Sequence, residues 1–93
     1  MLETLRYTVE FKEDSSRHNS PRFIRVHELA FYRGKDPGYT YQAVRRLGEF
    51  PIYELEDRKA VRKVMSALTR KFPNKRLESI DMNRIGVRGI DKV

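Results

Sequence analysis

A stretch of basic residues with no acidic neighbour is the part of the sequence best suited to do chemistry. Residues 58–76 carry eight basic side chains and no Asp or Glu: Arg58, Lys59, Arg62, Lys63, Arg70, Lys71, Lys75 and Arg76. Guanidinium and ammonium groups bind phosphate and carboxylate oxygens through charge-assisted hydrogen bonds. Because no acidic side chain neutralises them locally, these groups predict a surface that faces a polyanion.

The spacing of this stretch places its charges on one side of a helix. At about 100° per residue, five of these basic residues lie on one side with Ser66 and Thr69, whose hydroxyls could also bind phosphate: Arg58, Lys59, Arg62, Lys63 and Arg70. The apolar residues fall opposite: Val61, Val64, Met65, Leu68 and Phe72. The competing interpretation is an ordinary solvated helix face whose charges are balanced by acidic neighbours in space: Glu3, Glu10, Glu54, Glu56 and Asp57.

Residues 39–47 supply weaker candidates for the same surface. Arg45 and Arg46 could extend the basic patch, and Tyr39 and Tyr41 could stack on bases if this segment is a strand. A strand surface with aromatic side chains beside arginines commonly holds single-stranded RNA. The aromatic residues with periodic placement are instead expected in the core: Tyr7, Phe11, Phe50 and Phe72.

Catalysis and metal binding find little support in the sequence. His18 lies in a polar loop and His27 in an element of uncertain type, and neither is spaced to form a metal pair. Cleavage of RNA by either histidine, with arginine stabilising the phosphate, is chemically conceivable but not favoured. The acidic groups at 13–14 and 54–57 lack calcium-loop spacing. We therefore expect no enzyme activity, no metal site and no cofactor.

Residues 5–12 form the clearest predicted strand. Apolar and polar residues alternate there, so one face should be buried and the other wet. The expected buried face carries Leu5, Tyr7, Val9 and Phe11. The polar residues that follow, 13–19, predict a solvated loop.

The C-terminal half of the chain is predicted to contain one helix, which carries most of the basic residues, and two strands that position it. A helix should begin after Asp57, acting as its N-cap, and end before Pro73. Short strands are predicted over 50–55 and 76–82, on either side of that helix. Together these segments form a strand-helix-strand unit.

Two segments leave the topology open within a single α+β domain, 1–93. Residues 21–33 have a helix entrance at Ser20-Pro21 but strand-favouring side chains, and 39–47 are equally divided. If the first segment is a helix and the second a strand, the order is β-α-β-β-α-β, the ferredoxin-like arrangement. The alternative is an N-terminal antiparallel β-meander followed by the C-terminal β-α-β unit. Residues 84–93 are expected to be a loose tail or an edge strand.

Composition narrows the class of partner. The 93 residues include 20 Lys and Arg, 13 Asp and Glu and no Cys, which gives a net charge of +7. Such an excess attracts polyanions. The sequence has no apolar run of membrane-spanning length and no signal-peptide pattern at its start, so we expect a cytoplasmic protein without a membrane partner. The short chain has a thin stability margin, which leaves room for a homodimer.

These observations favour a non-enzymatic module that contacts the DNA or RNA backbone through the basic helix. The alternative is a small regulator or inhibitor that docks the same basic face on an acidic surface of a larger protein, such as a nucleic-acid enzyme. A protein interface should expose apolar anchors among the arginines, whereas a phosphate-binding surface should be elongated and lack an apolar centre.

Overall fold

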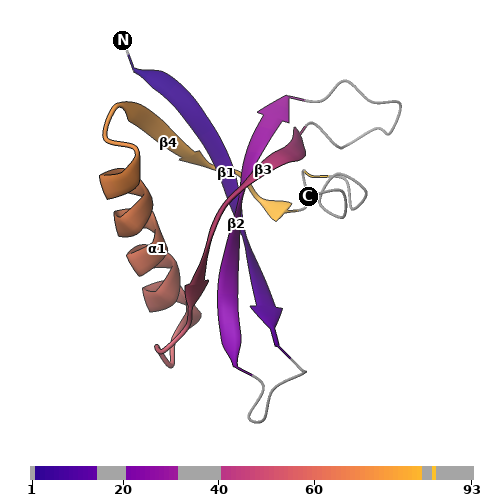
Figure 1. The fold of residues 1–93 in the computed structure, drawn as a ribbon, viewed down its shortest axis with the longest axis vertical. Coiled ribbons are helices and arrows are strands. Elements are labelled where there is room, and N and C mark those ends of the chain that lie inside the picture. The colour runs from indigo at the N-terminus through magenta and orange to yellow at the C-terminus, as the bar shows by residue number, and fades with distance from the viewer. Residues whose placement is uncertain (1, 15–20, 32–40, 83–84, 86–93) are drawn as a thin grey trace.

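The chain folds as one layer of β-sheet with one helix against it. The computed structural model describes residues 2–14, 21–31, 41–82 and 85. Within them, three strands precede a helix and a fourth strand follows it: β1 (Glu3–Glu13), β2 (Arg22–Phe31), β3 (Tyr41–Pro51), α1 (Asp57–Lys71) and β4 (Lys75–Ser79). The strand order is β3-β2-β1-β4. Figure 1 shows α1 on one side of the strongly twisted sheet. The predicted α+β class is confirmed.

The first three strands form an antiparallel meander. β1 pairs with β2 so that Val9 lies opposite Val26 and Phe11 opposite Ile24, and β2 pairs in turn with β3. Residues opposite each other share a face of the sheet, so this register brings the alternating apolar residues of β1 and β2 to the face that α1 covers. The alternation predicted for residues 5–12 holds for Leu5, Tyr7 and Val9. Phe11 was expected in the core but is 40 % exposed, because it lies at the far end of the strand, and Thr8, on the face expected to be wet, is buried.

The ferredoxin-like order is wrong, because residues 22–31 form a strand and the described residues contain one helix. Ile24 and Val26 are fully buried in the core with α1, and this packing, together with pairing to β1 and β3, outweighs the helix-entrance signal at Pro21. The meander alternative describes the N-terminal half correctly. Its C-terminal strand-helix-strand order is also present, as β3-α1-β4, with β3 and β4 at opposite edges of the sheet.

β3 is longer than either strand that the sequence suggested in this region. It spans most of 39–47 and the beginning of 50–55 in one strand, with register shifts opposite Val26/His27 and Glu28/Leu29. Each shift leaves one β3 residue, Leu47 or Val44, without a partner in the register. Such bulges interrupt the period of two, which explains why the sequence pattern looked half helical.

The helix is anchored to the sheet by one apolar stripe. Ala60, Val64 and Leu68 are buried in a core with residues of β1, β2 and β3: Leu5, Tyr7, Ile24, Val26 and Leu47. Met65 was expected in this core but is 44 % exposed, since it lies on the flank of the stripe. The predicted N-cap is also shifted, because Glu56 occupies that position without a side-chain cap and Asp57 begins the helix. The helix ends at Lys71, close to the stop expected from Pro73.

β4 completes the sheet by pairing in parallel with β1. Its bounds, Lys75–Ser79, fall within a residue of the predicted start but stop short of Met82. Beyond it, Ile80 and Ile85 belong to a second small core on the sheet face away from α1, and Ile85 forms a bridge with Tyr41. Most of the predicted tail or edge strand, 84–93, lies outside the described residues. Within the described part of the chain, no helix has the length and apolar character needed to cross a membrane.

Candidate functional site

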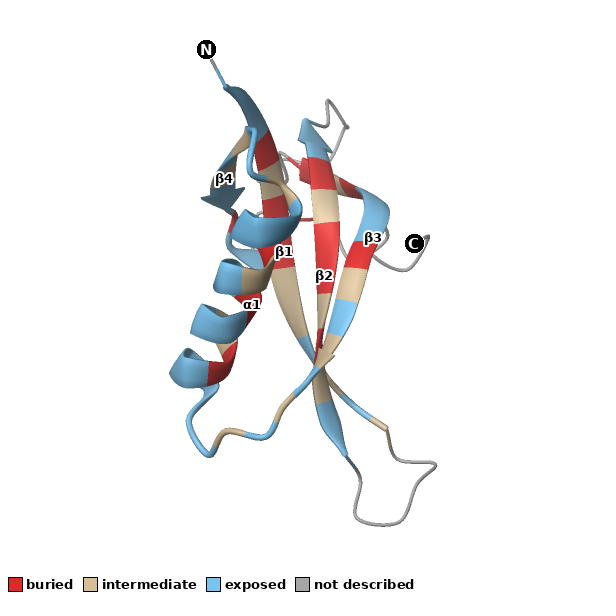
Figure 2. Ribbon diagram, turned by 60° about the vertical axis from the view of Figure 1, so that its left-hand side comes forward, coloured by how far each residue is buried: buried red, intermediate tan, exposed pale blue. Residues whose placement is uncertain are grey.

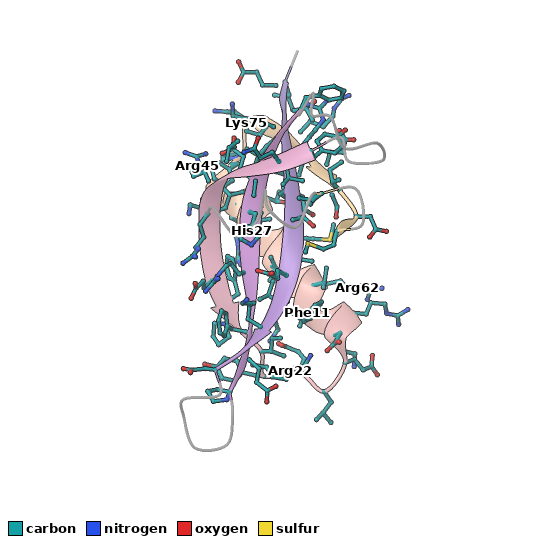
Figure 3. The ribbon with its side chains drawn as sticks, turned by 90° about the vertical axis from the view of Figure 1, so that its right-hand side faces the viewer. Phe11, Arg22, His27, Arg45, Arg62 and Lys75 are labelled. Carbon is teal, nitrogen blue, oxygen red and sulfur yellow. The ribbon has the colours of Figure 1, made fainter. Side chains whose placement is uncertain are left out.

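The outward side of α1 carries the basic residues that the sequence singled out. Arg58, Lys59, Arg62 and Arg70 are all exposed. None of the four forms an ion pair with another residue in the described part of the chain. Figure 2 shows this side of α1 exposed along the helix, and Figure 3 shows Arg62 extending away from the sheet. We call these four residues the helix cations.

The helix cations form an elongated array. Arg58 and Arg70 are twelve positions apart, which corresponds to about 18 Å along a helix axis. Between them, the exposed Ser66 makes no hydrogen bond to a described residue and is free to donate to a phosphate. Thr69 is less suited than expected, because its hydroxyl already donates to the Met65 carbonyl oxygen at 2.9 Å. The array is therefore mainly cationic, with one free hydroxyl donor.

Three other predicted cations are engaged within the molecule. Lys63 pairs with Glu54, and Lys75 pairs with Glu3. These hydrogen bonds lower the pKa of both carboxyl groups below the ordinary value. Lys71 donates to the Leu47 carbonyl oxygen on β3 at 2.9 Å. The charge-balanced interpretation thus holds for Lys63 and Lys75 but not for the helix cations.

The remaining predicted residues lie elsewhere on the sheet. Arg76 is exposed on the edge strand β4 and has no ion-pair partner among the described residues. Arg45 binds Glu28 at 2.7 Å and Arg46 binds Glu49 at 3.1 Å, both on the meander. Figure 3 shows Arg45 far from Arg62. The structure therefore does not join the meander arginines to the helix cations.

Of the two tyrosines predicted to stack on bases, Tyr41 is buried. Tyr41 is only 6 % exposed, and its ring packs edge-on against Phe31 with 5.8 Å between ring centroids. It is buried because it packs with Ile80 and Ile85, a contact that the local pattern could not indicate. Tyr39 lies outside the described residues.

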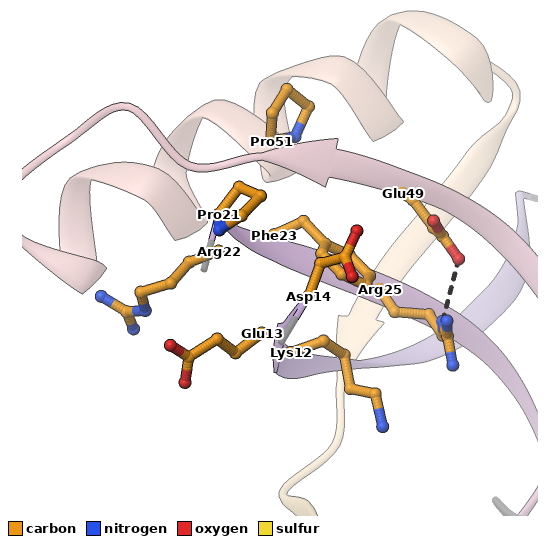
Figure 4. A pocket seen from close by; sticks show the side chains of 9 residues that line it. All are labelled: Lys12, Glu13, Asp14, Pro21, Arg22, Phe23, Arg25, Glu49 and Pro51. Carbon is orange, nitrogen blue, oxygen red and sulfur yellow. Dashed lines mark hydrogen bonds and ion pairs between the residues drawn. The ribbon is translucent and has the colours of Figure 1, made fainter. Parts of the chain in front are cut away.

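The sheet face away from α1 holds a second group of charges, at the end where β1 meets β2. A hollow of about 460 Å³ lies there, shown in Figure 4. Its cations have partners: Arg25 binds Glu49 at 3.0 Å and stacks on Phe23, and Arg22 binds Asp57 at 3.2 Å. Three carboxylates and three cations share its lining: Glu13, Asp14, Glu49, Lys12, Arg22 and Arg25. An anion entering it would meet as many negative as positive charges.

The histidines and acidic residues offer no assembled reaction centre in the described structure. His27 is 1 % exposed, and its Nε2 lies 3.1 Å from Glu10 Oε1. Such a buried ring cannot reach a phosphodiester. His18 lies outside the described residues. No group of three His, Cys, Asp or Glu side chains gathers to hold a metal ion in the ranges that the structure describes.

The connection between β3 and α1 contains exposed residues that the sequence analysis missed. Tyr53 is 82 % exposed and Leu55 is fully exposed, directly before the helix cations begin. They were assigned to a predicted strand over 50–55. Their parity was an available signal: Phe50 and Ile52 pack against the core, so odd-numbered neighbours in an extended segment should point outward.

Comparisons with protein-family models, with curated proteins and with solved structures found no match to this chain. The function is therefore inferred from the geometry of the chain itself. That geometry brings Arg58, Lys59, Arg62 and Arg70 together on one exposed helix face, with Tyr53 and Leu55 at its N-terminal end.

Proposed function

We propose that this protein is a non-enzymatic nucleic-acid-binding module whose helix cations contact the phosphate backbone. The observation that supports this most strongly is that the helix cations have no acidic partner among the described residues. They also extend over about 18 Å of the helix axis, from Arg58 to Arg70. Unpaired cations retain their full attraction for phosphates, whereas paired ones must first lose a partner. With no cysteine in the chain, we place this activity in a reducing, intracellular setting.

The salt dependence of binding tests this proposal. Four contacts to a single strand should make the affinity fall about 50-fold between about 50 and 200 mM salt, since each contributes about 0.7 to the slope. Replacing Arg58 and Arg62 by Gln should reduce this drop to about sevenfold by the same relation. Fluorescence anisotropy with a labelled oligonucleotide measures both values.

A charge-matched control separates the helix cations from net charge. The double variant Lys12→Gln with Arg45→Gln removes two charges from residues that lie on β1 and β3 and pair with acids. It should keep the wild-type salt dependence. Equal effects of the two double variants would contradict the proposal, as would the absence of wild-type binding at the lower salt concentration. Circular dichroism should confirm that both variants fold.

Exposed apolar residues beside the helix cations favour a second candidate function, docking on an acidic protein surface. Met65 lies within the helix face, and Tyr53 and Leu55 lie at its end. Apolar and aromatic anchors surrounded by charges are typical of protein interfaces. This candidate predicts that Met65→Ala weakens partner capture, whereas the phosphate-binding function should be insensitive to that change.

A further inference from the structure

An apolar cleft opens between the sheet and the N-terminal half of α1, next to the helix cations. Its volume is about 220 Å³. The walls are mainly hydrophobic and come from β2, β3 and α1: Ile24, Phe50, Pro51, Ala60 and Val64. Pockets for drug-sized ligands usually measure about 300–1,000 Å³, so this cleft suits one flat ring system.

The polar groups of the cleft are few and well placed. Glu54 lines it with a side chain that is 12 % exposed, and one of its carboxylate oxygens is buried. The carboxylate pairs with Lys63 and accepts the backbone N–H of Tyr53 at 3.2 Å. A carboxylate held this way offers its remaining lone pairs to an N–H donor of a ligand.

Tyr53 gives the cleft an aromatic edge. Its side chain lines the cleft and is nevertheless 82 % exposed, so most of the ring remains available to a ligand. Stacking of a base on an aromatic ring strengthens the binding of single strands and tolerates any base sequence. Every nucleobase also has an N–H donor on its hydrogen-bonding edge, which would match Glu54.

We propose that this cleft binds an unstacked nucleobase, so that the preferred ligand of the protein is single-stranded nucleic acid. The strand backbone would lie along the helix cations while one base stacks on Tyr53 and enters the cleft beside Glu54. A base inside a duplex is stacked and paired and cannot enter without being flipped. This inference rests on the proposed function and adds the form of nucleic acid that is bound.

The experiment compares three probes of equal charge: a single strand, the same strand with abasic residues, and a shorter duplex matched in phosphate number. Wild-type protein should bind the normal strand about tenfold more tightly than the abasic strand, in line with the cost of losing one stacked base. Tyr53→Ala should abolish this difference, while Tyr53→Phe should retain it because its ring still stacks.

Leu55→Ala is the matched control, since Leu55 is an exposed apolar residue on the same connection. It should bind all probes as the wild type does. Equal affinity of the wild type for normal and abasic strands would overturn the cleft proposal, and so would equal losses in Tyr53→Ala and Leu55→Ala. If binding still depends on Arg58 and Arg62 in either case, the proposed function stands and only the cleft fails. Absence of any binding rejects both.

Discussion

The outward face of α1 and the sheet face around Glu49 both carry arginines and lysines, but these cations are paired with carboxylates on the sheet and unpaired on the helix. On the sheet, the register of neighbouring strands places a carboxylate opposite a cation, as in Arg25 with Glu49 and Arg45 with Glu28. On the helix, residues one turn away from the helix cations are basic, small or apolar. Availability of a cation for a ligand is therefore decided by its spatial neighbours rather than by net charge.

The largest expected effect concerns the anchoring of α1 to the sheet. The difference between the helix cations and the paired cations of the sheet depends on this anchoring. Leu68→Ala should lower the free energy of unfolding by about 2–5 kcal/mol, because it removes a fully buried side chain and leaves a cavity. Met65→Ala, on the same helix but 44 % exposed, should cost much less. Urea unfolding followed by circular dichroism measures both values. Similar losses for the two variants would show that the buried stripe is assigned incorrectly.

Removing a carboxylate from the sheet face should make that face resemble the helix face. Glu49 accepts hydrogen bonds from both Arg25 and Arg46, so Glu49→Gln should release part of their charge and raise oligonucleotide affinity about twofold at low salt. Glu13→Gln changes the net charge equally without releasing either arginine. Anisotropy should show the smaller increase for Glu13→Gln. An unchanged affinity of the Glu49→Gln variant would mean that pairing with Glu49 does not limit the binding of oligonucleotides by Arg25 and Arg46.

The smallest effect probes the ion pair between Lys63 of α1 and Glu54. Lys63 lowers the pKa of Glu54, so the pair stabilises the fold above the ordinary carboxyl value of 4.5 and loses this contribution as the pH falls through the lowered pKa. Lys63→Gln should return the pKa of Glu54 toward its ordinary value. An NMR titration of the Glu54 carboxyl measures this change, and an unaltered titration would disprove the pairing.

Local sequence patterns were sufficient for β1, for α1 and for the exposure of the helix cations. A period of two identified residues 5–12, and helical spacing identified the face that carries Arg58 and Arg62. Both signals arise within one element. The bulges of β3 hide its period, however, so residues 39–47 could not be assigned from their pattern.

Pairings between distant segments account for what the sequence could not predict. The burial of Tyr41 depends on Ile85, and the neutralisation of Arg45 depends on its register with Glu28. The ion pair between Lys75 and Glu3 joins residues 72 positions apart.

The parallel pairing of β4 with β1 has a consequence for the way the protein is made. The ribosome releases the first strand long before the last, and folding that relies on such distant contacts is slow. The meander can pair as soon as β3 has emerged, but the sheet stays incomplete until Lys75–Ser79 join the edge of β1. During this interval, the nascent chain presents an unfinished β edge together with a growing positive charge, beside the ribosome's own RNA.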